Sequence, residues 1–225
     1  MKDNSLLKLG GACAILLGIA KFLASIAYFV VPPEQRLTVP GAQLLPSFAQ
    51  GSTFLMAIFW LEALVGVLGL AVVPALSSLV RTANEGWVRW TSNLALVGYA
   101  VSAVGYLLTV ARLPGIAAAY VAGDASTKAA LAVVWKSSPD LLGMWGYGVI
   151  GVWVLVVNLL AMRANTLPKL STYVGLVLAA LYVLVPVALL LKASTLILIV
   201  VGAGAVVAPI WYIWSGLILR RTSAG

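Results

Sequence analysis

The sequence predicts an all-α fold: a polytopic membrane helix bundle with about six transmembrane helices and both termini in the cytoplasm. Hydrophobic residues make up 63% of the 225 residues, and only 9% are charged. The mean hydropathy is +1.08, whereas a soluble domain normally has charges on about a quarter of its residues. Because each span needs about 20 apolar residues, six spans use most of the chain. We therefore expect a single transmembrane domain over residues 1–225.

Six apolar runs are long enough to cross a bilayer with a modest tilt. They are Leu6–Val31, Thr53–Val80, Val88–Ala111, Leu141–Met162, Leu170–Leu191 and Thr195–Leu219. The breaks between them carry helix-stop and helix-start residues. Pro32-Pro33 ends the first run, and Ser138-Pro139-Asp140 starts the fourth with an N-cap residue, a proline and an acid.

Basic residues near the ends of the spans predict the orientation. The side of the N-terminus holds Lys2, Lys8, Arg81, Arg89, Arg163, Lys169, Arg220 and Arg221, and the opposite side holds Arg36, Arg112, Lys128, Lys136 and Lys192. Aromatic residues beside the first group are interpreted as an interfacial belt: Trp87, Trp90, Trp211, Tyr212 and Trp214. We expect both termini in the cytoplasm and the protein in a bacterial cytoplasmic (inner) membrane.

Two long connections, 32–52 and 113–140, then lie outside. The first holds four prolines and shows no periodicity, so we expect an ordered or semi-ordered loop. In the second, residues 126–136 have helical character, with Ser126 as the cap and Leu131, Val134 and Trp135 toward lipid. This pattern predicts an interfacial helix that is too short to span.

The charge and the rare residue types exclude several kinds of site. The net charge is +8, but the basic residues are scattered at the ends of apolar runs, which indicates anionic lipid as the partner and not nucleic acid. The chain has no histidine, and Cys13 is its single cysteine. We therefore expect no metal site, no haem and no catalytic triad, and no enzymatic activity.

The most informative polar residues are Lys21 and Glu62. A charge at mid-membrane usually faces protein and has a partner. Lys21 lies ten residues before Val31, and Glu62 lies nine residues after Thr53, so both lie about 14 to 15 Å below the outer surface. We expect an intramembrane ion pair that fixes helix packing, or a ligand, ion or proton site. Snorkelling of Lys21 toward the lipid headgroups is the third possibility.

Other polar and flexible features lie in later spans. Span three carries a stripe of hydroxyl groups at Tyr99, Ser102 and Tyr106, which either packs against a neighbouring helix or lines a site. Span four opens with glycines around Trp145 and Tyr147, a pattern that allows close helix contact or a ring lying against backbone. Pro186 and Pro209 predict kinks in spans five and six. These features are interpreted first as packing.

Spans four to six resemble a known family. Asp140–Ala161 forms a glycine- and aromatic-rich span, a short basic loop follows, and Leu167-Pro168-Lys169-Leu170 opens the fifth span. This order resembles the small six-helix bacterial integral membrane proteins that are grouped as a domain of unknown function, although the histidines expected near the fourth span are absent here. The resemblance implies the six-helix topology, and it implies no mechanism.

Two functions fit these observations. The first is a non-catalytic accessory or stabilising subunit of a larger membrane complex, with other membrane subunits as partners and lipid or another apolar molecule held in place. The alternative is a transporter or substrate-binding membrane subunit with its site between helices one to three. The chain is similar in topology to the substrate-binding subunits of energy-coupling vitamin transporters. Those subunits dock through small residues on their helices, and Ala20 and Ala24 could play the same part in this chain.

Overall fold

The computed structural model describes residues 4–36, 39–137, 140–191 and 193–223, and the described chain is helical with no strand. Six helices are long and apolar enough to cross a membrane, which confirms the predicted all-α membrane fold. They are α1 (Asn4–Val30), α3 (Thr53–Val80), α4 (Glu85–Ala122), α6 (Asp140–Ala164), α7 (Lys169–Leu190) and α8 (Ser194–Thr222). The shorter elements are the 3-10 helix η1 (Pro33–Gln35), α2 (Gly41–Ala49) and α5 (Ala125–Ser137).

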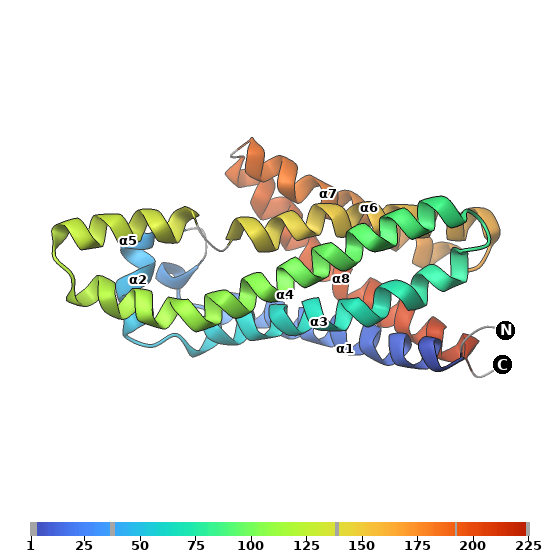
Figure 1. The fold of residues 1–225 in the computed structure, drawn as a ribbon, viewed down its shortest axis with the longest axis horizontal. Coiled ribbons are helices and arrows are strands. Elements are labelled where there is room, and N and C mark those ends of the chain that lie inside the picture. Colours follow the sequence, from blue (N-terminus) through green and yellow to red (C-terminus); the bar gives the residue numbers. More distant parts are fainter. Residues whose placement is uncertain (1–3, 37–38, 138–139, 192, 224–225) are drawn as a thin grey trace.

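The six long helices form a closed ring. Each packs against the next one in chain order, from α1 to α3, α4, α6, α7 and α8, and α8 packs back on α1. Both termini lie at the same end of the bundle (Figure 1). A buried apolar cluster fills the half of the ring nearest the termini, with Leu17, Leu76, Trp153 and Trp211 among its fully buried side chains. The ring interior is therefore a packed core in which a polar group needs a specific partner.

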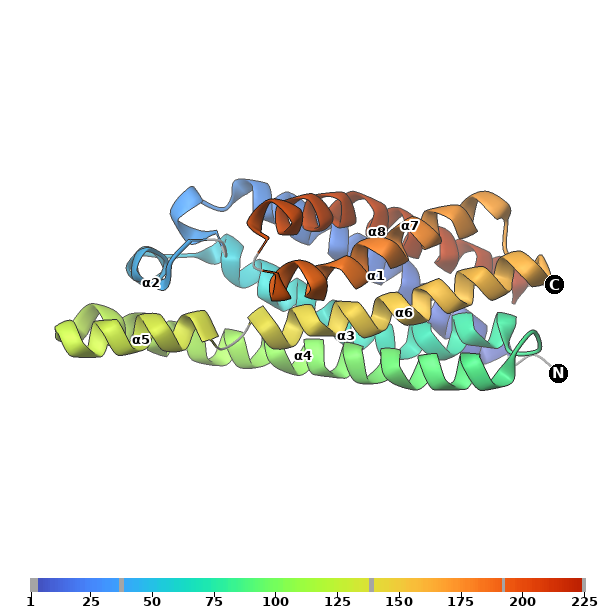
Figure 2. The ribbon, with the colours of Figure 1, turned by 90° about the horizontal axis from the view of Figure 1, so that it is seen from above.

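The end of the bundle away from the termini carries a helical cap, which consists of α2, the C-terminal end of α4, and α5. Helix α4 has 38 residues and is therefore about 57 Å long, longer than the 40–45 Å of a whole bilayer. Helices α5 and α6 lie end to end along it, and α2 packs on α4 and α5 (Figures 1 and 2). The predicted outer loop 113–140 is thus largely helix, because Leu113 and Ala117 continue the buried face of α4.

The short helix predicted at 126–136 is present as α5, but its contacts differ from the prediction. Trp135 is only 6% exposed and packs in the cap with Leu44, Leu45 and Leu113, so it does not face lipid. The N-cap residue of α5 is Asp124 and not Ser126. The Asp124 Oδ1 accepts hydrogen bonds from the Thr127 backbone N–H at 2.8 Å and from the Ser126 hydroxyl at 2.9 Å. The backbone bond from Thr127 is the main reason that the pKa of Asp124 falls to about 2.

The first connection, predicted as an ordered or semi-ordered loop, contains two short helices, η1 and α2. Gln35 is buried, and its Nε2 donates to the carbonyls of Ser47 at 3.1 Å and Gly51 at 2.8 Å. These bonds fix the C-terminal end of α2 relative to η1. The prolines concealed α2 from sequence reasoning, because Pro46 lies inside that helix.

Glycines set the distance between neighbouring helices of the ring. A Cβ atom on Gly66 of α3 would lie 2.7 Å from the backbone N of Ala103 and 2.8 Å from the backbone O of Tyr99, both on α4. On Gly202 of α8, a Cβ atom would meet no described atom within 4 Å. The two glycines therefore differ in whether a methyl group has room.

This contrast generates a stability prediction. We expect Gly66→Ala to lower the free energy of unfolding by about 1–3 kcal/mol, because α3 and α4 must separate. Gly202→Ala should raise it by up to about 1 kcal/mol through helix propensity. Thermal unfolding in mild detergent, followed by circular dichroism, measures both. Equal shifts in the same direction would show that the close α3–α4 contact is absent.

Candidate functional site

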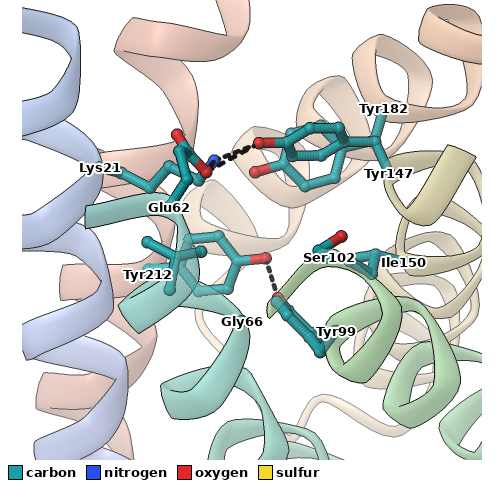
Figure 3. Close-up of a pocket in the computed structure, with 10 residues that line it drawn as sticks. Lys21, Glu62, Gly66, Tyr99, Ser102, Tyr147, Ile150, Tyr182 and Tyr212 are labelled. Atoms are coloured by element: carbon teal, nitrogen blue, oxygen red, sulfur yellow. Dashed lines mark hydrogen bonds and ion pairs between the residues drawn. The ribbon is translucent and has the colours of Figure 1, made fainter. Parts of the chain in front are cut away.

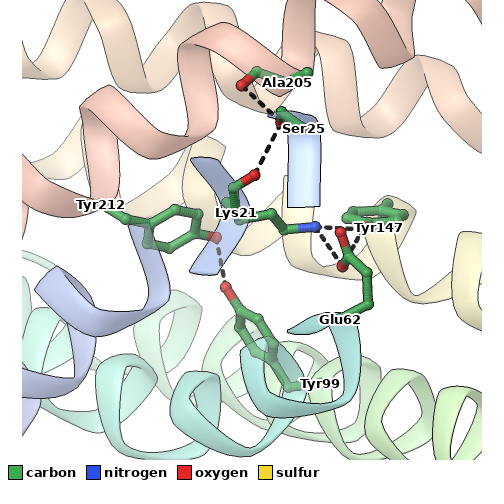
Figure 4. Close-up of polar contacts among 7 residues, drawn as sticks. All are labelled: Lys21, Ser25, Glu62, Tyr99, Tyr147, Ala205 and Tyr212. Carbon is green, nitrogen blue, oxygen red and sulfur yellow. Dashed lines mark hydrogen bonds and ion pairs between the residues drawn. The ribbon is translucent and has the colours of Figure 1, made fainter. Parts of the chain in front are cut away.

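An ion pair lies between the first two spanning helices. Lys21 of α1 and Glu62 of α3, which the sequence places at similar depth, meet with the Lys21 Nζ 2.6 Å from the Glu62 Oε2. Tyr147 of α6 joins them: the Lys21 ammonium donates to the Tyr147 hydroxyl at 2.5 Å, and that hydroxyl donates to the Glu62 Oε2 at 3.0 Å. The three groups form a closed triangle of hydrogen bonds (Figure 4).

Burial makes this triangle energetically important. The side chain of Lys21 is 9% exposed and that of Glu62 is 13% exposed, so neither charge can be hydrated fully. In a medium of low dielectric an unpaired charge is costly, and the cost falls only when its hydrogen-bonding capacity is used. The triangle gives both charges a partner. Snorkelling of Lys21 toward the lipid headgroups is therefore not the conformation observed.

Four tyrosines surround the ion pair. The hydroxyls of Tyr99 and Tyr212 are hydrogen-bonded to each other at 2.5 Å, and the ring of Tyr182 lies 4.9 Å from that of Tyr147 at an interplanar angle of 59°. Figure 3 shows these side chains converging from opposite sides of the ring of helices. We call the following residues the central cluster: Lys21, Glu62, Tyr99, Ser102, Tyr147, Tyr182 and Tyr212. Each of the six spanning helices contributes at least one of them.

Small residues allow the bulky rings to reach the centre. The ring of Tyr99 lies directly against Gly69 of α3, where a Cβ atom would be 2.2 Å from Tyr99 Cδ1. A Cβ atom on Gly146 would lie 2.4 Å from the Ser102 Oγ, and one on Gly151 would lie 2.9 Å from the Tyr182 Cβ. The glycines of α3 and α6 thus position the tyrosines as well as the helices.

The central cluster encloses a small cavity of about 10 Å³. A cavity of this size has room for roughly one water molecule. The groups available to a ligand here are one ammonium, one carboxylate, and hydroxyl groups that both donate and accept. Among the residues that the structure describes, no three His, Cys, Asp or Glu side chains gather as metal ligands would.

The predicted hydroxyl stripe of span three divides between two places. Tyr99 and Ser102 line the central cavity. Tyr106 instead packs in the cap cluster, where its ring stacks on Phe59 at 6.2 Å. The side chain of Tyr106 is also hydrogen-bonded to Tyr147. The structure thus brings Lys21, Glu62, Tyr99 and Ser102 together and places Tyr106 beside them, at the border with the cap.

Sequence reasoning missed Tyr182 and misinterpreted Tyr212. The aromatic pattern predicts Trp211 and Tyr212 in an interfacial belt near Arg220, yet both are fully buried in the ring. They precede Arg220 by eight or nine residues, which is about 12 to 14 Å along a helix and too deep for an interface. The available signal was a tyrosine well inside each of the last three spans: Tyr147, Tyr182 and Tyr212.

A proline connects α8 to α1 beside the cluster. Pro209 has no N–H, so the carbonyl of Ala205, four residues earlier, loses its partner within the helix. The hydroxyl of Ser25 on α1 lies 3.2 Å from that carbonyl and 2.8 Å from the carbonyl of Lys21. A hydroxyl has one proton to donate, so Ser25 divides it between the carbonyl of Lys21 on its own helix and the carbonyl of Ala205 on α8 (Figure 4).

The triangle generates a prediction about coupling. Lys21→Met and Glu62→Gln should each lower the free energy of unfolding by about 3–5 kcal/mol, because each leaves a buried charge unpaired. The double variant should lose much less, since no unpaired charge remains. Chemical or thermal unfolding of all four proteins in one detergent gives the coupling energy.

The matched control is the pair Arg81 and Glu85, an exposed i,i+4 ion pair with the Arg81 Nη2 2.5 Å from the Glu85 Oε1. Arg81→Met and Glu85→Gln should show no measurable coupling, because water screens exposed charges. If the effects of Lys21→Met and Glu62→Gln are simply additive, the two side chains do not interact.

Comparison with known proteins agrees with the architecture. A family model described as a domain of unknown function (DUF4386) matches residues 10–218, a range that includes every residue of the central cluster. No curated protein and no solved structure matched the chain. The match confirms the predicted resemblance to a membrane family of unknown function and extends it from the last three spans to nearly the whole chain. This multi-pass membrane protein belongs to the DUF4386 family.

Proposed function

We propose that this protein is a non-catalytic membrane transport protein and that the central cluster is its substrate site. The observation that carries the proposal is the convergence of one polar group or more from each of the six spans on a single point. The sequence favoured an accessory subunit and, as the alternative, a transport site between helices one to three. The geometry favours the transport alternative and adds α6, α7 and α8 to the site.

Energetics support a role beyond packing. A buried ion pair is a weak source of stability, because desolvation of both charges offsets most of their attraction, and well-packed apolar residues often serve as well. An ionisable residue inside a membrane is accordingly a functional-site hypothesis by default. Helix packing alone needs neither the charge of Lys21 nor that of Glu62.

The position of the cluster also supports transport. Lys21 lies nine residues before the end of α1 at Val30, which corresponds to about 14 Å, close to half the thickness of a hydrocarbon core. Substrate sites of many transporters lie near the midplane, where interrupted helices meet. Here α7 and α8 contain Pro186 and Pro209. The proline kinks give the two helices places to bend when the site opens.

The proposed orientation follows from the distribution of basic residues. We place the termini in the cytoplasm of a bacterial cell and the cap of α2 and α5 on the outer side of the cytoplasmic membrane. Membrane lipids are the immediate partners, and we propose no cofactor. The central cavity of about 10 Å³ is far too small for a lipid chain, so any bound lipid belongs on the outside of the ring.

A second candidate function remains the accessory subunit. A Cβ atom added to Gly202 of α8, which is exposed, would meet no described atom within 4 Å, and Ile199 and Val206 nearby are also exposed. Small residues on a lipid-facing surface let another helix approach closely. This surface offers a place for a partner subunit.

A ligand screen tests the transport proposal. The purified chain in mild detergent is heated with cations, anions, zwitterions and neutral polar compounds. At least one compound should stabilise the wild type, by about 2.7 kcal/mol at a hundredfold excess over its Kd. The double variant Lys21→Met/Glu62→Gln should not respond, whereas Arg81→Met/Glu85→Gln should respond like the wild type.

Two results would contradict the transport proposal. One is that no compound distinguishes the wild type from the Lys21→Met/Glu62→Gln variant. The other is native mass spectrometry in which the chain is always held by other membrane proteins and never carries a small molecule. The second result would favour the accessory subunit.

A further inference from the structure

We infer that the central site takes a small zwitterion, a molecule with one ammonium or quaternary ammonium group and one carboxylate. This inference rests on the proposed function and names the substrate class of that same site. The observation behind it is the meeting of one buried cation and one buried anion at 2.6 Å, inside a ring of tyrosine side chains.

Charge balance selects the ligand. A lone cation bound to Glu62 would displace Lys21 and leave its ammonium without a counter-charge, although the side chain is only 9% exposed. A lone anion bound to Lys21 would do the same to Glu62. An unpaired charge in the membrane interior costs several kcal/mol. A zwitterion exchanges one ion pair for two and leaves no charge unpaired.

The tyrosines fit both ends of such a ligand. The hydroxyl of Tyr147 already accepts from the Lys21 ammonium and donates to the Glu62 carboxylate, so it can serve an ammonium or a carboxylate of the ligand in the same way. The adjacent rings of Tyr147 and Tyr182, 4.9 Å apart, provide aromatic faces that attract a cation. A neutral sugar or an acyl chain would use neither charge.

The cavity limits the size of the ligand. At about 10 Å³ the closed site holds roughly one water molecule, so the ligand enters by separating Lys21 from Glu62. The flexible stem of Lys21 permits that separation without movement of α1. The ligand must therefore be small, with its two charges a few bonds apart so that both remain within reach of the protein charges.

Two matched sets of probes isolate charge from size. The first set is glycine, glycinamide and propionate, and the second is glycine betaine, choline and 3,3-dimethylbutanoate. Within each set the three molecules have nearly the same shape. The first carries both charges, the second only the positive charge, and the third only the negative charge. Binding to the full chain in detergent is measured near neutral pH by equilibrium dialysis and by the rise in unfolding temperature.

For the wild type we expect the zwitterion of at least one set to bind about tenfold tighter, or more, than its two singly charged counterparts. Single substitutions should switch this preference. Glu62→Gln leaves Lys21 unpaired and should favour the anion of the set, whereas Lys21→Met leaves Glu62 unpaired and should favour the cation. Arg81→Met/Glu85→Gln should keep the preference of the wild type.

The outcomes separate this inference from the proposed function. If the wild type binds a singly charged or neutral compound best, and the Lys21→Met/Glu62→Gln variant loses that binding, the transport site stands and the zwitterion inference is overturned. If nothing binds in a manner that depends on Lys21 and Glu62, both fail. The comparison within the wild type remains decisive even where a single variant does not fold.

Discussion

The structure depends on one constraint: each of two opposite charges buried in the membrane interior needs a partner. Lys21 and Glu62 meet at 2.6 Å, and this contact requires α1 and α3 to lie side by side in one register. Tyr147 of α6 is hydrogen-bonded to both charges, so the constraint extends across the ring to a helix that is distant in sequence. Because an unpaired charge here is costly, this contact restricts how α1, α3 and α6 can pack.

The glycines and prolines of the ring follow from the same constraint. Tyrosine rings enter the central cluster where the facing helix offers no side chain, as Gly69 does for Tyr99 and Gly151 does for Tyr182. Pro209 frees a carbonyl on α8, and Ser25 of α1 donates to it one turn from Lys21. The cap of α2, α4 and α5 has its own apolar cluster and covers the end of the ring away from the termini. Apolar packing thus supplies the frame, and the polar centre sets the positions of the helices within it.

The sequence was most informative where a residue has few physical options. A lysine and a glutamate in apolar runs need partners, and helical rise placed both at one depth, so their pairing could be predicted. The fold class followed from hydropathy alone. Sequence reasoning did not place the tyrosines of α7 and α8 in the site, because their positions depend on the closure of the ring by α8 against α1, two helices that are distant in sequence. Pro46 concealed α2, and the extension of α4 beyond Ala111 was missed because its buried face there contacts the cap and not the ring.

The most direct test of the central ion pair is a distance measurement between the two charges in a lipid bilayer. The chain is labelled with ¹⁵Nζ-lysine and ¹³Cδ-glutamate, reconstituted, and examined by solid-state dipolar-recoupling NMR. Among the described residues Lys21–Glu62 is the only lysine–glutamate ion pair. We expect a strong nitrogen–carbon coupling in the wild type, as an Nζ–Oε2 separation of 2.6 Å requires, and its loss in Lys21→Met. Absence of that coupling in the wild type, or its survival in Lys21→Met, would contradict the central claim.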